Sequence, residues 1–172
     1  MAKQKRNKNV LLSALIVLAC AVCSLVSCSS DGCTNNLGCV PKAGFYSNAT
    51  KNSVMVDSIT IYGVGVPGDS MLTECGRVTS VYLPLRMSTD MCQYVFHYDQ
   101  KAISNPLFND TITFHYDVVP YFESSECGAI VQFDITDFTY TRHVIDSVAV
   151  PFTHITNVDV ETVKIFFRTS ER

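Results

Sequence analysis

The sequence of 172 residues contains no tryptophan, and only 17% of its residues are charged. Hydrophobic residues make up 47% of it, which excludes a disordered polar chain. Basic residues are also in the minority, with 13 Lys and Arg against 16 Asp and Glu, so we expect no nucleic-acid partner. The length suits one ordinary domain.

The chain also lacks a recognisable catalytic signature. No serine lies in a nucleophile elbow, and Cys33 and Cys39 do not have the two-residue separation of a zinc-binding pair. Cys127 precedes Gly128 but has no histidine beside it in the sequence. We therefore expect a non-catalytic protein without a cofactor.

The first 28 residues have the pattern of an export signal. Basic residues between Lys3 and Lys8 precede an apolar stretch over residues 10–26. A retained membrane helix is the alternative, since this stretch is close to the shortest that spans a bilayer. The next residues, Leu25-Val26-Ser27-Cys28, resemble the lipobox of bacterial lipoproteins.

The lipobox resemblance implies a signal peptide over residues 1–27, and acyl chains on Cys28. Removal of this signal peptide takes away four basic residues and no acidic one, which leaves the mature chain with a net charge of −7. Because such a domain gains no electrostatic adhesion to an anionic membrane, the lipid must anchor it. No dense acidic run follows Cys28, so we expect the outer membrane and its periplasmic face. Residues 28–42 are rich in Ser, Asn, Gly and Pro and are interpreted as a lipidated tether.

Residues 43–172 have the pattern of one all-β domain. Short runs rich in Val, Ile, Thr, Tyr and Phe alternate with turn residues, and no amphipathic helix is evident. We predict an antiparallel β-sandwich of seven to eight strands, with a small β-barrel as the alternative. The clearest predicted strands are 53–62, 77–85, 92–99, 111–119, 128–138, 144–152 and 162–168.

Several short segments resemble a group of small Bacteroidetes outer-membrane lipoproteins with a β-rich domain of unknown function. They are Ile59–Gly63, Val81–Leu85, Ser125–Gly128 and Val163–Phe167, in this order and after a cysteine shortly behind the lipobox. The resemblance implies a location and a small β-rich domain, but no reaction. It also implies a disulfide between Cys33 and Cys127.

Five cysteines follow Cys28 in the mature chain. In an oxidising envelope they should pair, and an odd number leaves two bridges and one free thiol as the simplest state. Beside the pair implied by the resemblance, Cys75 is expected to bond to Cys39 or to Cys92.

The tetrapeptide Phe-His-Tyr-Asp occurs twice, at residues 96–99 and 114–117. Alternation along a strand places each pair of aromatic residues on one face, and the His and Asp on the other. We expect the aromatic face to be core. If the two strands formed a hairpin centred near Asn105-Pro106, the alternative would be a divalent-metal site, acting as a hydrolase centre. Its candidate ligands are His97, Asp99, His115 and Asp117.

A triplet of Asp, a hydroxyl residue and an apolar residue occurs four times, more often than composition alone predicts. It is similar to the acceptor motif of general O-glycosylation in the Bacteroidetes periplasm. The hydroxyl residues are Ser58, Ser70, Thr111 and Ser147, of which Ser70 and Thr111 are the better candidates because they lie near predicted turns.

These features together favour a lipid-anchored envelope domain that binds a protein or a glycan. The membrane is then a partner through the anchor, and exposed aromatic residues could form a glycan platform. The candidates for that platform are Tyr46, Phe138 and Tyr140.

Overall fold

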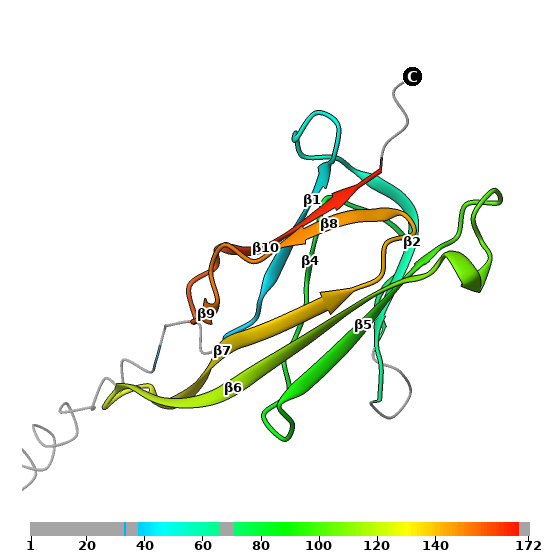
Figure 1. Cartoon of the computed structure of the whole chain (residues 1–172). Helices are drawn as coiled ribbons and strands as arrows, with labels where there is room; N and C mark the ends of the chain where they lie inside the picture. Colours follow the sequence, from blue (N-terminus) through cyan, green and yellow to red (C-terminus); the bar gives the residue numbers. More distant parts are fainter. Residues whose placement is uncertain (1–32, 34–37, 66–70, 169–172) are drawn as a thin grey trace, which may run out of the picture. The chain divides into compact units, whose positions relative to one another are not determined.

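The computed structural model describes residues 33, 38–65 and 71–168. All secondary structure in this part of the chain belongs to one compact unit, Asn35–Arg172, with ten strands and one short 3-10 helix (Figure 1). The elements are β1 (Lys42–Ser47), β2 (Val56–Gly63), β3 (Met71–Val78), β4 (Ser80–Tyr82), β5 (Met91–Tyr98), η1 (Pro106–Phe108), β6 (Asp110–Ser124), β7 (Gly128–Tyr140), β8 (Ile145–Ala149), β9 (His154–Ile155) and β10 (Glu161–Phe167).

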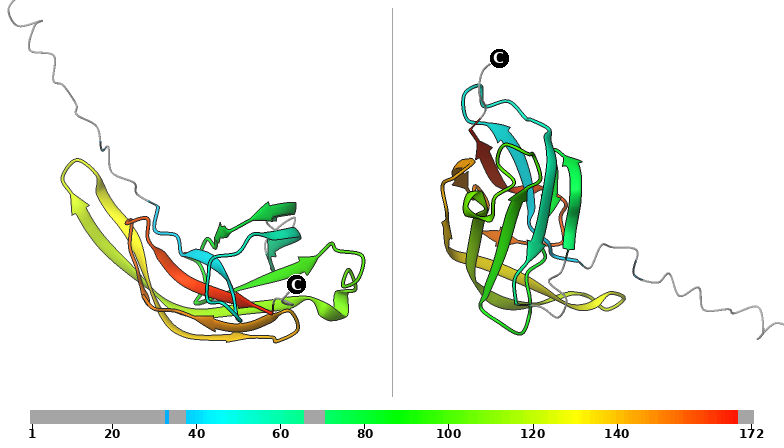
Figure 2. Two further views of the ribbon diagram at one scale, coloured as in Figure 1. Left: turned by 90° about the horizontal axis from the view of Figure 1, so that it is seen from above. Right: turned by 90° about the vertical axis from the view of Figure 1, so that its right-hand side faces the viewer.

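The strands form two separate sheets, as the predicted β-sandwich requires. One sheet has the order β4-β1-β10-β8 and the other β3-β2-β5-β6-β7-β9. The six-stranded sheet curls around the other without joining it, so the alternative of a closed barrel is wrong (Figure 2). Every pairing of neighbouring strands in these sheets is antiparallel except that of β1 with β10, which is parallel.

The described part of the chain has ten strands rather than the predicted seven to eight, because the sequence pattern did not reveal the short ones. The predicted run over residues 77–85 is broken at Thr79, where the chain leaves β3 in one sheet and starts β4 in the other. The Thr79 carbonyl accepts a hydrogen bond from the backbone N–H of Phe45 in β1, at 2.9 Å, which fixes the crossing. Strands β1 and β9 were not predicted, since β1 contains Lys and Gly and β9 has only two residues.

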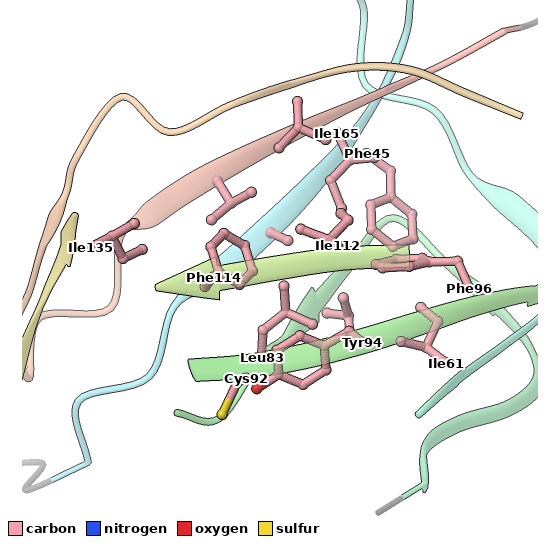
Figure 3. Close-up of a cluster of buried hydrophobic side chains, with 14 of the residues drawn as sticks. Phe45, Ile61, Leu83, Cys92, Tyr94, Phe96, Ile112, Phe114, Ile135 and Ile165 are labelled. Atoms are coloured by element: carbon pink, nitrogen blue, oxygen red, sulfur yellow. The ribbon is translucent and has the colours of Figure 1, made fainter. Parts of the chain in front are cut away.

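The core lies between the two sheets (Figure 3). Both copies of the repeated tetrapeptide place their aromatic residues there, since Phe96 and Phe114 are fully buried and Tyr98 and Tyr116 almost so. The predicted core face of the tetrapeptide is therefore confirmed. Each buried aromatic side chain contributes roughly 1.5–3 kcal/mol through the apolar surface that it removes from water.

A buried carboxylate organises the corner at which the chain passes from β7 to β8. Asp110 has no exposed surface and accepts five hydrogen bonds of 2.7–3.0 Å. Two come from the hydroxyls of Tyr98 and Thr141, and three from the backbone N–H groups of residues 143–145. Because backbone donors fill most of its acceptor sites, Asp110 holds this corner in one conformation.

The β6–β7 hairpin is longer than the other strand pairs and projects beyond the sandwich (Figures 1 and 2). Its outer part carries apolar residues that the core does not cover, among them Val118 of β6. Phe122 is 67% exposed and Tyr121 46% exposed, next to the turn that contains Cys127. The hairpin thus presents aromatic side chains to solvent at its tip.

Candidate functional site

An apolar groove opens at the end of the sandwich where β5 and β10 end. We call it the distal groove, and its volume is about 360 Å³. The ends of β5 and β10, beside which the groove opens, lie at the opposite end of the domain from the start of the continuously described chain (Figure 1). The apolar lining of the groove comes from segments far apart in the sequence: Val54, Met55, Val56, Ile103, Val144 and Phe167.

The corner around Asp110 supports the distal groove. Tyr98 and Val144 line the groove, and both donate a hydrogen bond to the Asp110 carboxylate, at 2.8 Å each. Burial raises the pKa of the Tyr98 phenol, and the Asp110 charge raises it further. Tyr98 therefore stays a neutral donor, and the groove wall is held by a network that cannot rearrange without leaving the buried Asp110 carboxylate short of hydrogen-bond donors.

The rim of the distal groove is polar but its charges are already paired. The Asp57 carboxylate forms a salt bridge with the Arg77 guanidinium, with 2.9 Å between Oδ2 and Nη2. The Nε atom of Arg168 lies 3.4 Å from the Asp146 carboxylate. The Arg168 Nη1 atom donates a hydrogen bond to the backbone carbonyl of His143, at 2.9 Å. The groove thus offers an apolar hollow with a neutral rim, which suits an apolar side chain rather than an ion.

The two His-Tyr-Asp copies do not converge. The observed register pairs His115 of β6 with Met91 of β5, while the His97 Nδ1 contacts the side-chain oxygen of Asn109 at 2.7 Å. The two histidines are thus six positions apart along the ladder, about 20 Å at strand spacing. The hairpin register in which His97 faces His115 is wrong, because β6 starts at Asp110 and pairs Phe96 with it.

Each copy uses its polar residues differently. The Asp99 carboxylate lies 3.6 Å from the His97 ring and accepts a hydrogen bond from the Thr60 hydroxyl, at 2.7 Å. Asp99 thus links β5 to the neighbouring strand β2. His115 and Asp117 are exposed. Within the described ranges, no three His, Cys, Asp or Glu side chains lie close enough together to hold a metal ion.

A second, smaller cavity contains a thiol beside a guanidinium. It has a volume of about 140 Å³ and is lined in part by Arg86, Cys92 and Tyr94. The Cys92 sulfur accepts from Arg86 Nε at 3.4 Å and lies 3.1 Å from the Tyr116 hydroxyl. The pKa of the Tyr116 phenol is raised to about 12, mainly by burial and secondly by the hydrogen bond with Cys92. The sequence did not predict this cluster, because its members come from β5, from β6 and from the loop between β4 and β5 and form no local pattern.

The cysteines are only partly paired. Cys33 and Cys127 are disulfide-bonded, whereas Cys39, Cys75 and Cys92 are free thiols. The second bridge, from Cys75 to Cys39 or Cys92, is therefore wrong. Cys75 is exposed on the edge strand β3, while Cys39 and Cys92 are buried in the core.

The four glycosylation candidates differ in their surroundings. Thr111 is half-buried and follows the fully buried Asp110, so the acidic residue of its triplet faces the interior. Ser58 and Ser147 are half-buried within β2 and β8. Ser70, like Cys28 and the predicted signal peptide, lies outside the described residues.

The aromatic residues considered for a glycan platform are partly covered. Tyr46 donates to Glu161 at 2.6 Å, and the Lys164 ammonium lies 5.1 Å from the centre of its ring. Phe138 and Tyr140 are half-buried and stack on each other, with ring centres 6.4 Å apart.

The described fold defines a small β-sandwich domain with an apolar groove at one end. The chain belongs to DUF6452, a family of unknown function, whose match covers residues 58–167, from within β2 to the end of β10. No curated protein and no solved structure matches it. In the part of the chain that the structure describes, no helix is long and apolar enough to cross a membrane.

Proposed function

We propose that this protein is a lipid-anchored, non-catalytic domain of the bacterial cell envelope that binds a protein partner. The lipobox-like Leu25–Cys28 supports the anchor, and the short segments that resemble Bacteroidetes lipoproteins support the outer membrane. The lack of a dense acidic run after Cys28 favours the periplasmic side of that membrane. In this proposal, acyl chains on Cys28 hold the domain at the membrane, and the sandwich presents its far end to the partner.

The distal groove is the observation that carries the binding role. It is an apolar hollow of about 360 Å³, and its lining includes the exposed side chain of Met55. A protein partner fits better than a glycan because the groove lacks an open aromatic ring and an unpaired charged group on its rim. An apolar side chain of the partner would displace water from the hollow, which is the usual source of affinity at such sites.

Photo-crosslinking in the native host tests the binding role. A photoreactive residue replaces Met55 in the groove or, as a control, Met87, an exposed methionine outside the groove. We expect a discrete protein adduct from position 55 alone, and its loss when Ile103→Arg places a charge in the groove. Equal labelling from both positions, or none from position 55, would reject the groove as a binding site. A thermal melt of Ile103→Arg verifies that the variant is folded.

Membrane fractionation and intact mass test the anchor. Protein from the native host should carry the mass of a diacylglyceryl group and an acyl chain on Cys28, and Cys28→Ala should abolish it. An additional glycan mass is expected if Ser70 or Thr111 is O-glycosylated. A mature N-terminus other than Cys28 would contradict the proposal.

Non-reducing peptide mapping tests the proposed pairing of Cys33 with Cys127. One linked peptide pair containing both residues is expected. In the chain-entropy treatment, such a bridge stabilises the fold by roughly 4 kcal/mol because it closes a long loop. A link from either cysteine to a different one would contradict the pairing.

A further inference from the structure

The tip of the β6–β7 hairpin has apolar side chains that the described part of the domain leaves exposed. Phe122 is 67% exposed and Tyr121 46% exposed, and Val118 on the same strand is also exposed. Phe122 is paired across the hairpin only with Ala129, which cannot shield a ring. Exposed aromatic side chains that cluster on a projecting element mark a contact surface.

The same end of the domain holds a second exposed apolar segment. Val158 and Val160, between β9 and β10, are 62% and 44% exposed. Their neighbour Asn157 donates to the Glu123 carboxylate near the end of β6, at 3.4 Å. The hairpin and this loop therefore form one surface.

The chain also reaches the sandwich at this end. Gly38 and Val40 line a shallow hollow together with Val158. The buried thiol of Cys39 lies close enough to Glu123 for the carboxylate charge to raise its pKa, in addition to the effect of burial. The beginning of the continuous domain, the hairpin and the β9–β10 loop thus gather on one side, opposite the ends of β5 and β10 that flank the distal groove (Figures 1 and 2).

The length of the preceding chain limits how far this end can lie from the anchor. Gly38 follows Cys28 by ten residues, which span at most about 35 Å when extended. If Cys33 is bonded to Cys127, five residues separate the acylated cysteine from a residue that is covalently tied to the hairpin turn, a span of about 17 Å. The tip cannot then leave the vicinity of the lipid headgroups.

We propose that the tip of the β6–β7 hairpin rests in the phospholipid headgroup layer of the membrane that holds the anchor, with Phe122 and Tyr121 as its contacts. This inference rests on the proposed acylation of Cys28. Aromatic side chains favour this layer, because the ring leaves water while a phenol hydroxyl keeps polar partners. The Glu123 and Glu126 carboxylates limit the depth, since they must stay hydrated. The contact supplements the acyl chains and orients the distal groove away from the bilayer.

The absence of tryptophan provides a direct test. The full acylated chain carrying Phe122→Trp is placed in vesicles of phosphatidylethanolamine with a minority of phosphatidylglycerol. The matched control is Leu107→Trp in η1, at the other end of the domain, where the native side chain is 77% exposed. We expect blue-shifted emission, and quenching by lipids with brominated acyl chains, for Phe122→Trp only.

The outcomes separate the membrane contact from the anchor. If both variants float with the vesicles and Phe122→Trp is quenched no more than Leu107→Trp, the hairpin contact is wrong while the acylation stands. If neither variant floats or carries the acyl mass, the proposed anchor fails and the hairpin contact fails with it. An emission shift that needs added envelope protein would assign the tip to a protein partner and also overturn the proposal.

Discussion

The two Phe-His-Tyr-Asp segments have the same sequence but different surroundings. Their aromatic residues behave alike, since Phe96 and Phe114 are fully buried and Tyr98 and Tyr116 are 2% and 1% exposed. Strand alternation places these four side chains on the core face, and this constraint acts equally on both copies.

The polar partners of the two segments differ because their neighbours differ. The Tyr98 hydroxyl donates to the buried carboxylate of Asp110, whereas that of Tyr116 donates to the backbone carbonyl of Arg86 and contacts Cys92. His97 is bonded to Asn109, while His115 is exposed. A repeated sequence therefore repeats its core role, but not its hydrogen bonds.

The largest effect should be common to both copies. Phe96→Ala and Phe114→Ala each remove a fully buried ring, so each should lower the free energy of unfolding by about 3–5 kcal/mol. Urea denaturation of the two variants measures this. A loss below about 1 kcal/mol at either position would contradict the shared core role.

The tyrosine hydroxyls should distinguish the copies. Tyr98→Phe removes a donor to a buried charge and should cost about 1.5–3 kcal/mol of unfolding free energy. Tyr116→Phe removes bonds to neutral groups and should cost about 0.5–1.5 kcal/mol. Equal costs in urea denaturation would show that Asp110 does not depend on Tyr98.

Alkaline pH should reveal the buried phenols. Burial raises the pKa of Tyr116 to about 12 from its usual value of 10, so the folded state holds this proton more tightly than the unfolded state. This contribution to stability is complete below pH 10 and is lost as the pH rises from 10 to about 12. The melting temperature of Tyr116→Phe should therefore fall less steeply than that of the wild type over this range. Parallel curves would contradict the raised pKa.

The histidines should differ by a smaller amount. His97→Ala loses the contact with Asn109 and should cost about 0.5–1.5 kcal/mol. His115→Ala changes an exposed side chain and should stay within about 0.5 kcal/mol of the wild type. Denaturation of both variants at one pH makes the comparison, and a larger cost at His115 would reverse it.

Zinc should have the smallest effect. Because His97 and His115 lie on separate parts of the β5–β6 ladder, added Zn²⁺ should leave the melting temperature of metal-free protein unchanged. A rise in the wild type that His97→Ala and His115→Ala both abolish would instead support the metal-dependent hydrolase.

Alternation was a good guide where strands are long and one face is buried. It predicted the runs that became β2, β5, β6, β7 and β10, together with the aromatic core. It failed at Thr79, where strand-forming residues continue although the chain changes sheets. The register of β5 with β6 could not be predicted, because it depends on how Asp110 is held at the corner by backbone groups 30 or more residues further along the chain.

The distal groove lay beyond sequence reasoning for a similar reason. Met55, Ile103 and Phe167 lie in connections or at strand ends that come together only in the folded domain. No local pattern distinguishes these side chains from other apolar residues of the chain. The state of the cysteines was equally hard to predict. An odd number of cysteines shows that at least one stays unpaired, but not which thiols lie too far apart in the fold to form a disulfide.

The parallel pairing of β1 with β10 has a consequence for the order in which this domain can form. Lys42–Ser47 lies between β4 and the strand Glu161–Phe167, the last of the described strands along the chain. A growing or translocating chain therefore exposes one edge of β1 until Glu161–Phe167 has emerged. Pairing across such a sequence separation is slow, since the loop must close before the contact stabilises it. The nascent chain then has an open strand that a holding chaperone could recognise, and the domain should acquire protease resistance only once β10 has paired with β1.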